Sequence, residues 1–263
     1  MPVLLFLFLG ANGAAGPTLP QAKPEAVGMR AEKLAEIDAA VDEALRARQM
    51  PGCVVLLARR GKIVRLRAYG NRAIEPEMLP MTVDTVFDLA SLTKPVATAT
   101  SVMLLVEDGK LALDDPVAKH LPEFAANGKE AITVRQLLTH QGGLIADNPL
   151  DDFADGPERA IERLLAITPR NKPGEKFVYS DVGFMVLGEL VRRVAGQKLD
   201  EFACARLFQP LGLKETGYLP SEPLRRRAAP CEKREGRWMQ GKVHDPRAYA
   251  LGGVAGHAGL FST

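Results

Sequence analysis

Ser91 and Lys94 are the residues of this chain whose types and spacing best suit chemistry. They open the segment Ser91-Leu92-Thr93-Lys94, and a helix there would place hydroxyl and amine on one face. The N-terminus of a helix carries partial positive charge, which favours an uncharged amine and a serine alkoxide. Pro95 suits a first helical turn, where its missing N–H costs no hydrogen bond. The spacing therefore predicts a serine nucleophile activated by a basic neighbour, as in acyl transfer.

Tyr179 is a second candidate, in the segment Tyr179-Ser180-Asp181 that precedes an apolar stretch at 182–195. A phenol beside cationic groups can relay a proton between the nucleophile, the amine and a leaving group. A packed tyrosine followed by an aspartate that caps a helix is the more ordinary explanation of the same residues. On this segment alone both interpretations stay open.

Four segments in order resemble the penicillin-recognising serine hydrolases, which include class C β-lactamases, D-alanyl-D-alanine carboxypeptidases and related esterases. They are FDLASLTK at 87–94, LLTHQGGL at 137–144, YSDVGF at 179–184 and GHAGLFST at 256–263. The resemblance covers the chain from about residue 25 to the end. It implies that Ser91 forms an acyl-enzyme, that Lys94 and Tyr179 move its proton, and that the Ser91 backbone N–H stabilises the oxyanion. No cofactor is implied.

Asp181 departs from the family pattern, which usually has asparagine at this substrate-binding position. Asparagine both donates and accepts hydrogen bonds, whereas an ionised aspartate only accepts. A carboxylate here favours a protonated Lys94, which would pass the role of base to Tyr179. The letters of His257-Ala258-Gly259 also match the family's third motif. In relatives such a stretch precedes a helix, so the resemblance implies that the third motif and the second oxyanion donor are missing from this chain.

The resemblance implies an α/β plus all-α fold of the β-lactamase/transpeptidase type. In it an antiparallel sheet flanked by helices joins a helical lobe, and here the C-terminal strands are expected to be missing. Apolar periodicity and turn residues predict a helix at 31–48, a hairpin of strands 53–58 and 63–69, a loop at 70–86, and helices at 91–107, 133–140, 158–166, 182–195 and 199–211. Ser262 and Thr263 suit a helix N-cap. We expect a catalytic domain over 25–263 that is incomplete at its C-terminus.

Composition indicates an ordinary globular protein, with 46% hydrophobic residues and a net charge of +2. That charge argues against bulk nucleic-acid binding, and no later run is long enough for a membrane span. The apolar residues 3–9, followed by small residues, predict a signal peptide over 1–20 and a periplasmic or secreted protein. A cytoplasmic protein with an N-terminal strand or a misplaced start is the alternative.

Arg226 and Trp238 are substrate-binding candidates in a basic segment, residues 222–247. The segment is either a solvated face or a cleft wall that attracts a substrate carboxylate. The substrate is predicted to carry an acyl group, in a β-lactam, a D-alanyl peptide or a small ester, and the protein to be a monomer. A relative without activity that binds cell-wall peptide, or an inactive fragment, is the rival interpretation.

The remaining histidines and cysteines give weaker signals. His140 is predicted to cap or shape the end of a helix. His244, Asp245 and His257 lack a third ligand with sensible spacing, so we predict no metal site. The three cysteines form no disulfide framework.

Overall fold

The computed structural model describes residues 19–263. Most of the predicted signal peptide, residues 1–20, lies outside the described residues. In chain order the elements, where η marks a 3-10 or π turn, are η1 (Pro24–Val27), α1 (Ala31–Arg46), β1 (Gly52–Arg59), β2 (Lys62–Ala73), β3 (Leu79–Pro80), β4 (Phe87–Asp88), η2 (Ala90–Leu92), η3 (Lys94–Ala99), α2 (Thr100–Glu107), η4 (Val117–Lys119), η5 (Pro122–Ala125), α3 (Val134–Leu138), η6 (Leu150–Phe153), α4 (Pro157–Leu165), α5 (Asp181–Ala195), α6 (Leu199–Ala203), η7 (Cys204–Phe208), β5 (Gly217–Tyr218), α7 (Glu222–Arg227), β6 (Lys233–Arg234), β7 (Arg237–Trp238), α8 (Pro246–Ala250) and β8 (Leu260–Ser262).

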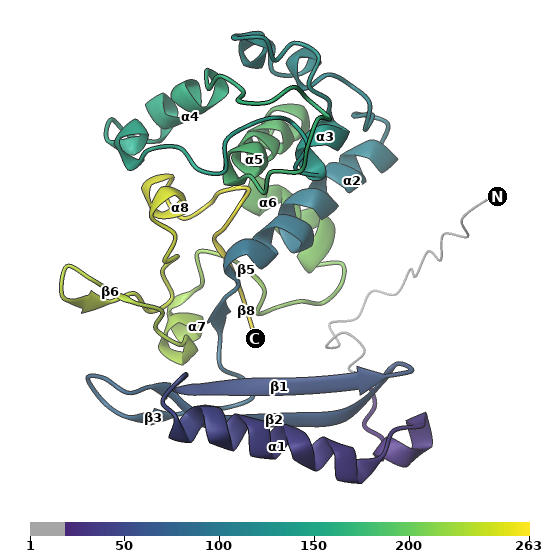
Figure 1. The fold of residues 1–263 in the computed structure, drawn as a ribbon, viewed down its shortest axis with the longest axis vertical. Coiled ribbons are helices and arrows are strands. Elements are labelled where there is room, and N and C mark those ends of the chain that lie inside the picture. Colours follow the sequence, from purple (N-terminus) through teal and green to yellow (C-terminus); the bar gives the residue numbers. More distant parts are fainter. Residues whose placement is uncertain (1–18) are drawn as a thin grey trace.

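The first unit is a helix packed on a hairpin, as predicted. β1 pairs antiparallel with β2, and α1 lies along the two strands at one end of the molecule (Figure 1). The carboxylate of Asp38 on α1 accepts hydrogen bonds from Arg65 and Tyr69 of β2, which ties the helix to the strand. The predicted loop at 70–86 is wrong in part. Leu79 and Pro80 form β3 against β2, and a two-residue pairing leaves no apolar alternation to detect.

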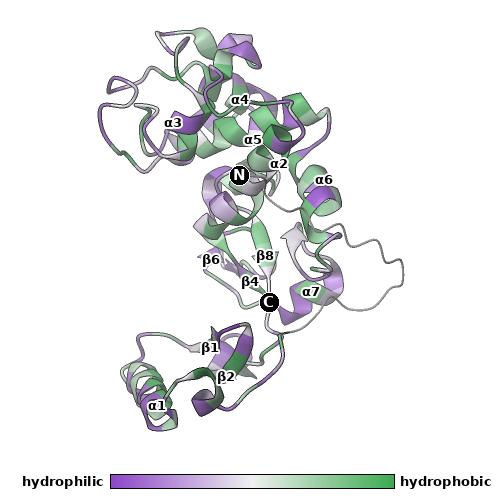
Figure 2. Ribbon diagram, turned by 90° about the vertical axis from the view of Figure 1, so that its right-hand side faces the viewer, coloured by the Kyte–Doolittle hydropathy of each residue, from purple (hydrophilic) through white to green (hydrophobic). Residues whose placement is uncertain are grey.

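The opposite end of the molecule is a helical lobe built around α5. Ten consecutive residues of this helix, Val182 to Val191, are buried, because α2, α3, α4 and α6 all pack against it. Figure 2 shows the apolar colouring of α5 and its neighbours in this lobe. A helix that is apolar on every side is expected at the centre of such a lobe.

A small sheet in the order β4-β8-β5 lies between the two ends (Figures 1 and 2). Phe87 pairs with Ser262, and Gly217 pairs with Phe261. The strand β8 was not predicted, because the residues before Thr263 suggested a helix cap. Leu260 and Phe261 are instead buried with strands on both sides, and the Ser262 hydroxyl is 2.7 Å from that of Thr216.

The predicted helix at 91–107 exists but begins irregularly. It starts as a 3-10 turn, continues as a π-helical turn over Lys94–Ala99, and becomes α-helical only at Thr100. Pro95 supplies no N–H to the first turn, and the Thr100 hydroxyl donates to the Pro95 carbonyl oxygen over 2.9 Å. No helix within residues 19–263 is both long and apolar enough to cross a membrane.

Candidate active site

The structure places the Lys94 amine beside the Ser91 hydroxyl. Lys94 Nζ lies 3.1 Å from Ser91 Oγ. Ser91 is exposed, whereas Lys94 is only 2% exposed. The hydroxyl is therefore open to a substrate, while the amine that could take its proton is shielded from water.

A strained turn presents Ser91. The residue before it, Ala90, has φ +46°, a left-handed conformation that is uncommon for a residue with a Cβ. The fully buried carboxylate of Asp88 holds this turn, because Oδ1 accepts from Ala90 N over 2.9 Å and Oδ2 accepts from His244 N over 2.9 Å. Strain of this kind persists where the surrounding structure fixes it, and it is common at functional sites.

The strand β8 fixes the other side of the same turn. Leu89 N donates to Leu260 O over 2.9 Å, and Leu260 N donates to the buried Thr93 hydroxyl over 3.0 Å. Because Leu89 precedes Ser91 and Thr93 follows it, the strand is hydrogen-bonded to residues on both sides of the nucleophile candidate. The unpredicted strand therefore positions the site.

Lys94 Nζ has polar and aromatic neighbours besides Ser91. It lies 2.6 Å from Asp181 Oδ1 in an ion pair that lacks hydrogen-bond alignment, and it donates to the His257 carbonyl oxygen over 3.2 Å. The ring centroids of Tyr179 and Phe184 lie 4.8 and 5.9 Å from the same nitrogen. A carboxylate, a carbonyl oxygen and two aromatic rings therefore surround the amine.

Tyr179 reaches the site through its ring. The side chain is 46% exposed, and within residues 19–263 its hydroxyl forms no hydrogen bond with Ser91 or Lys94. The Tyr179 ring stacks on His140 with centroids 4.4 Å apart. The structure thus brings Tyr179 to Lys94, although not in the hydrogen-bonded arrangement of a direct proton relay.

His140 does more than shape the end of a helix. It has φ +58° just beyond α3, its Nδ1 accepts from Ser180 N over 3.0 Å, and its carbonyl oxygen accepts from Val178 N over 2.9 Å. Burial, followed by the charge of Lys94, lowers the pKa of His140 against the opposing effect of Asp181. A neutral imidazole can accept the Ser180 N–H, so His140 holds the backbone on both sides of Tyr179.

Asp245 and His257 form a buried pair next to Asp181. His257 is 1% exposed, and its Nε2 lies 2.8 Å from Asp245 Oδ1. One ring nitrogen of His257 and one oxygen from each aspartate lie within 4.8 Å of one another. Burial raises the pKa of Asp245, but the hydrogen bond and charge of His257, with Ala248 N, hold it at about 2.

Sequence reasoning missed this cluster, because it found no third partner for Asp245 and His257 at a sensible spacing in the sequence. Asp181 is that partner, although it lies far from both in the sequence. The Lys94 side chain pairs with this cluster through Asp181. Ligand atoms of Asp88, Cys231 and His244 also lie within 4.8 Å of one another. Both oxygens of the Asp88 carboxylate, however, already accept hydrogen bonds, from Ala90 N in the turn before Ser91 and from His244 N.

Arg226 and Trp238 lie apart from these contacts. Arg226 is exposed on α7 and lies 3.7 Å from Glu222 in an ion pair, and Trp238 on β7 has Lys233 Nζ 5.0 Å from its ring centroid. Within the described residues, no hydrogen bond or ion pair links either side chain to Ser91 or Lys94. Their assignment to substrate binding stays a prediction.

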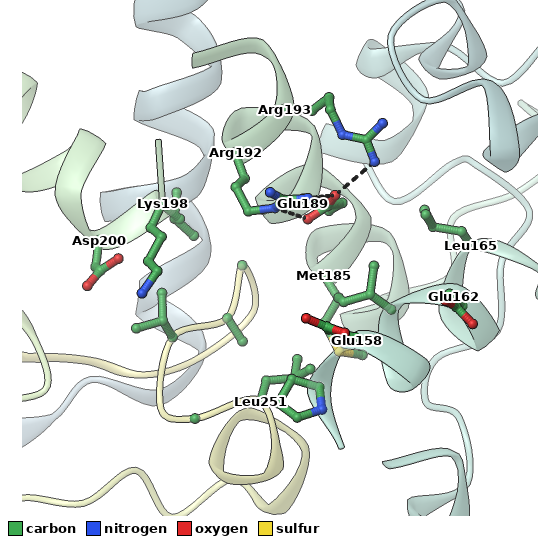
Figure 3. A pocket seen from close by; sticks show the side chains of 18 of the residues that line it. Glu158, Glu162, Leu165, Met185, Glu189, Arg192, Arg193, Lys198, Asp200 and Leu251 are labelled. Carbon is green, nitrogen blue, oxygen red and sulfur yellow. Dashed lines mark hydrogen bonds and ion pairs between the residues drawn. The ribbon is translucent and has the colours of Figure 1, made fainter. Parts of the chain in front are cut away.

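A cavity of about 930 Å³ lies between α4, α5, the start of α6 and residues 251–256 (Figure 3). Met185 lies on its wall with Glu189, whose carboxylate is paired with Arg192 and Arg193. Neither Ser91 nor Lys94 lines it. Residues 254–256 separate this cavity from the cluster that holds His257.

A comparison with known families matches residues 37–263 to the family described as Beta-lactamase. The chain belongs to the beta-lactamase family. A curated relative from Escherichia coli K12, named "Putative D-alanyl-D-alanine carboxypeptidase", is 31% identical over 98% of this chain and 68% of its own length.

Solved structures of other proteins show a similar fold. The octameric penicillin-binding protein homologue from Pyrococcus abyssi matches with a TM-score of 0.71 and 27% identity, over 88% of this chain and 53% of that one. EstCE1, described as a hydrolase with promiscuous acyltransferase activity, matches with a TM-score of 0.71 and 27% identity, over 88% of this chain and 69% of its own. This chain thus spans about half of the Pyrococcus protein.

These similarities confirm the family resemblance and the β-lactamase/transpeptidase-like fold class. The relatives also support a hydrolase function for this member of the beta-lactamase family. The roles of single site residues, the domain limits, the monomeric state and the signal peptide stay predictions.

Proposed function

We propose that this chain is a serine hydrolase that transfers an acyl group to Ser91 and then to water. The observation that carries the proposal is the 3.1 Å contact between the exposed Ser91 hydroxyl and the buried Lys94 amine. A hydroxyl within hydrogen-bond reach of a base, presented by a strained turn, is the arrangement of an activated nucleophile.

In the proposed reaction, Ser91 Oγ attacks the carbonyl carbon of the substrate while its proton passes to Lys94 Nζ. The bond from carbon to the leaving group then breaks, and the leaving group takes that proton, either directly or through the half-exposed Tyr179 phenol. Water attacks the resulting Ser91 ester, releases the acid and returns the hydrogen to Ser91. The Ser91 backbone N–H is the proposed donor to the oxyanion, and one such donor is worth about 100- to 1,000-fold in rate.

The substrate class follows from the relatives. We propose a D-alanyl peptide as the first natural substrate to test, because the Escherichia coli relative carries the name of a carboxypeptidase for that peptide. Small esters are the second class, because the description of EstCE1 names acyltransferase activity. An exported location belongs to the same proposal and rests on the apolar residues 3–9.

Covalent labelling with a fluorescent penicillin and hydrolysis of p-nitrophenyl acetate test the proposal. The unmodified chain is expected to react in at least one assay, and Ser91→Ala is expected to be silent in both. Ser221→Ala is the matched control, because Ser221 is an exposed serine at the start of α7 whose side chain caps nothing.

Two results would contradict the proposal. A Ser91→Ala protein that reacts as fast as the unmodified chain would mean that another group is acylated. A folded wild-type chain that is silent in both assays, yet binds a D-alanyl peptide, would favour the non-catalytic relative instead.

A further inference from the structure

His257 contacts the Lys94 and Asp181 pair in two ways. Its carbonyl oxygen accepts a hydrogen bond from Lys94 Nζ over 3.2 Å, and a nitrogen of its ring lies within 4.8 Å of an Asp181 carboxylate oxygen. Residue 257 therefore contacts the amine through its backbone and faces the carboxylate through its side chain.

The backbone of the segment before His257 is fixed. Gly256 packs so closely on α5 that a Cβ would lie 1.9 Å from the Phe184 carbonyl oxygen. On the other side, the buried Thr98 hydroxyl donates to the Gly256 carbonyl oxygen over 2.7 Å. The segment is thus held between α5 and the helical turn that carries Lys94, and the imidazole has little freedom to move away.

Packing alone does not explain a histidine at this place. The ring is 1% exposed, and its Nδ1 has no hydrogen-bond partner within the described residues. A polar atom buried in this way destabilises a fold, which an apolar side chain would avoid. Its other nitrogen lies 2.8 Å from Asp245 Oδ1, a partner that orients the ring.

The charges of the cluster show what the imidazole offers. Asp181 and Asp245 bring two negative charges, and Lys94 brings one positive charge when protonated. If His257 is neutral, loss of the Lys94 proton leaves the negative charges of Asp181 and Asp245 without a positive charge inside this largely buried cluster. If His257 is protonated, loss of the Lys94 proton leaves only one negative charge without a positive partner. The imidazolium therefore makes the uncharged amine easier to form.

We propose that His257, oriented by Asp245, is a positioning residue that offsets the Asp181 carboxylate and so allows Lys94 to act as a base. The inference rests on the proposed function, in which Lys94 takes the Ser91 proton. This role explains why residue 181 can be acidic. The Asp181 carboxylate positions the Lys94 amine, and His257 reduces the degree to which that carboxylate favours the protonated amine.

The titratable groups around His257 come from three elements. Asp245 lies at the start of α8, Asp181 at the start of α5, and Lys94 on η3. Arg247, also on α8, acts on Asp245 through its charge. The Tyr179 ring lies 4.8 Å from Lys94 Nζ, and His140 stacks on that ring. A substitution at His257 should therefore affect the reactivity of Ser91 through Asp181 and Lys94.

The test is the pH dependence of kcat/KM for p-nitrophenyl acetate in four proteins: the unmodified chain, His257→Gln, Asp181→Asn and His120→Gln. Activity that needs an uncharged Lys94 rises with pH. His257→Gln should move this rise to higher pH by about one to two units, a loss of about 10- to 100-fold below it. Asp181→Asn should move the rise to lower pH.

His120→Gln is the matched control. His120 also pairs with a carboxylate, with Nε2 3.0 Å from Asp115 Oδ2, but it lies outside the Ser91 cluster. This variant should show the same dependence of kcat/KM on pH as the unmodified chain. KM should change little in His257→Gln and His120→Gln, because neither histidine is proposed to touch the substrate.

The results separate this inference from the proposed function. A silent unmodified chain contradicts the proposed function, and the inference with it. An active chain whose rise stays within 0.3 pH units in His257→Gln contradicts the inference alone. If His257→Gln melts before it can be assayed, His257→Asn takes its place under the same criterion: a rise at higher pH supports the inference, and an unmoved rise overturns it.

Discussion

Replacing Lys94 by methionine should separate what the amine does for catalysis from what it does for stability. Methionine keeps most of the side-chain volume but removes the charge. The Asp181 carboxylate then loses the ammonium group that lies 2.6 Å away. The Asp181 side chain is 19% exposed, so the carboxylate stays largely out of water without its ion-pair partner.

Breaking a buried ion pair by removing one partner costs about 3–5 kcal/mol, because the other charge is left uncompensated. Water reaches part of Asp181, so we expect the lower end, about 3 kcal/mol, in the free energy of unfolding. Loss of a positioned base should lower the acylation rate by about 100- to 10,000-fold. The double variant Lys94→Met with Asp181→Asn also removes the uncompensated carboxylate. It should regain about 2 kcal/mol of unfolding free energy without regaining activity.

Urea unfolding gives the stabilities, and stopped-flow acylation by p-nitrophenyl acetate gives the rates. A Lys94→Met protein that acylates within tenfold of the unmodified rate would refute the role of the amine as the base. A double variant no more stable than the single one would refute the uncompensated carboxylate as the source of the instability. Asp181→Asn alone serves as the control for any direct effect of the amide.

Two further predictions concern the support of the site. Gly256→Ala should cost about 3 kcal/mol in urea unfolding, because its Cβ would lie 1.9 Å from the Phe184 carbonyl oxygen. Gly217→Ala, whose Cβ would meet nothing within 4 Å, should change stability by less than about 0.5 kcal/mol. Asp245 has a pKa lowered from 3.8 to about 2, so it stabilises the fold above about pH 4, and about 2 kcal/mol of that is lost as the pH falls through 2. Unfolding free energies at pH 5, 3 and 2 should therefore fall less steeply in Asp245→Asn, and an unchanged slope would contradict the assignment.

The sequence by itself determined the parts of this protein that depend on near neighbours in the chain. Ser91 and Lys94 are three residues apart on one helical turn, so their 3.1 Å contact follows from local geometry. The hairpin of β1 and β2 and the buried helix α5 follow in the same way from apolar pattern and turn residues. The ordered motifs were also sufficient to predict the family and the fold.

Only the tertiary structure decided which groups surround the Lys94 amine. His257 is 163 positions away in the chain and contacts it through a carbonyl oxygen, which every residue type possesses and no sequence pattern marks. The pairing of Asp245 with His257 beside Asp181 likewise depends on packing between α5, α8 and the last segment. The strand β8 pairs on each side through two residues, too few for a periodic pattern to reveal. Backbone contacts and charge balance depend on distances in space, and the order of residues sets these only after the whole chain has folded.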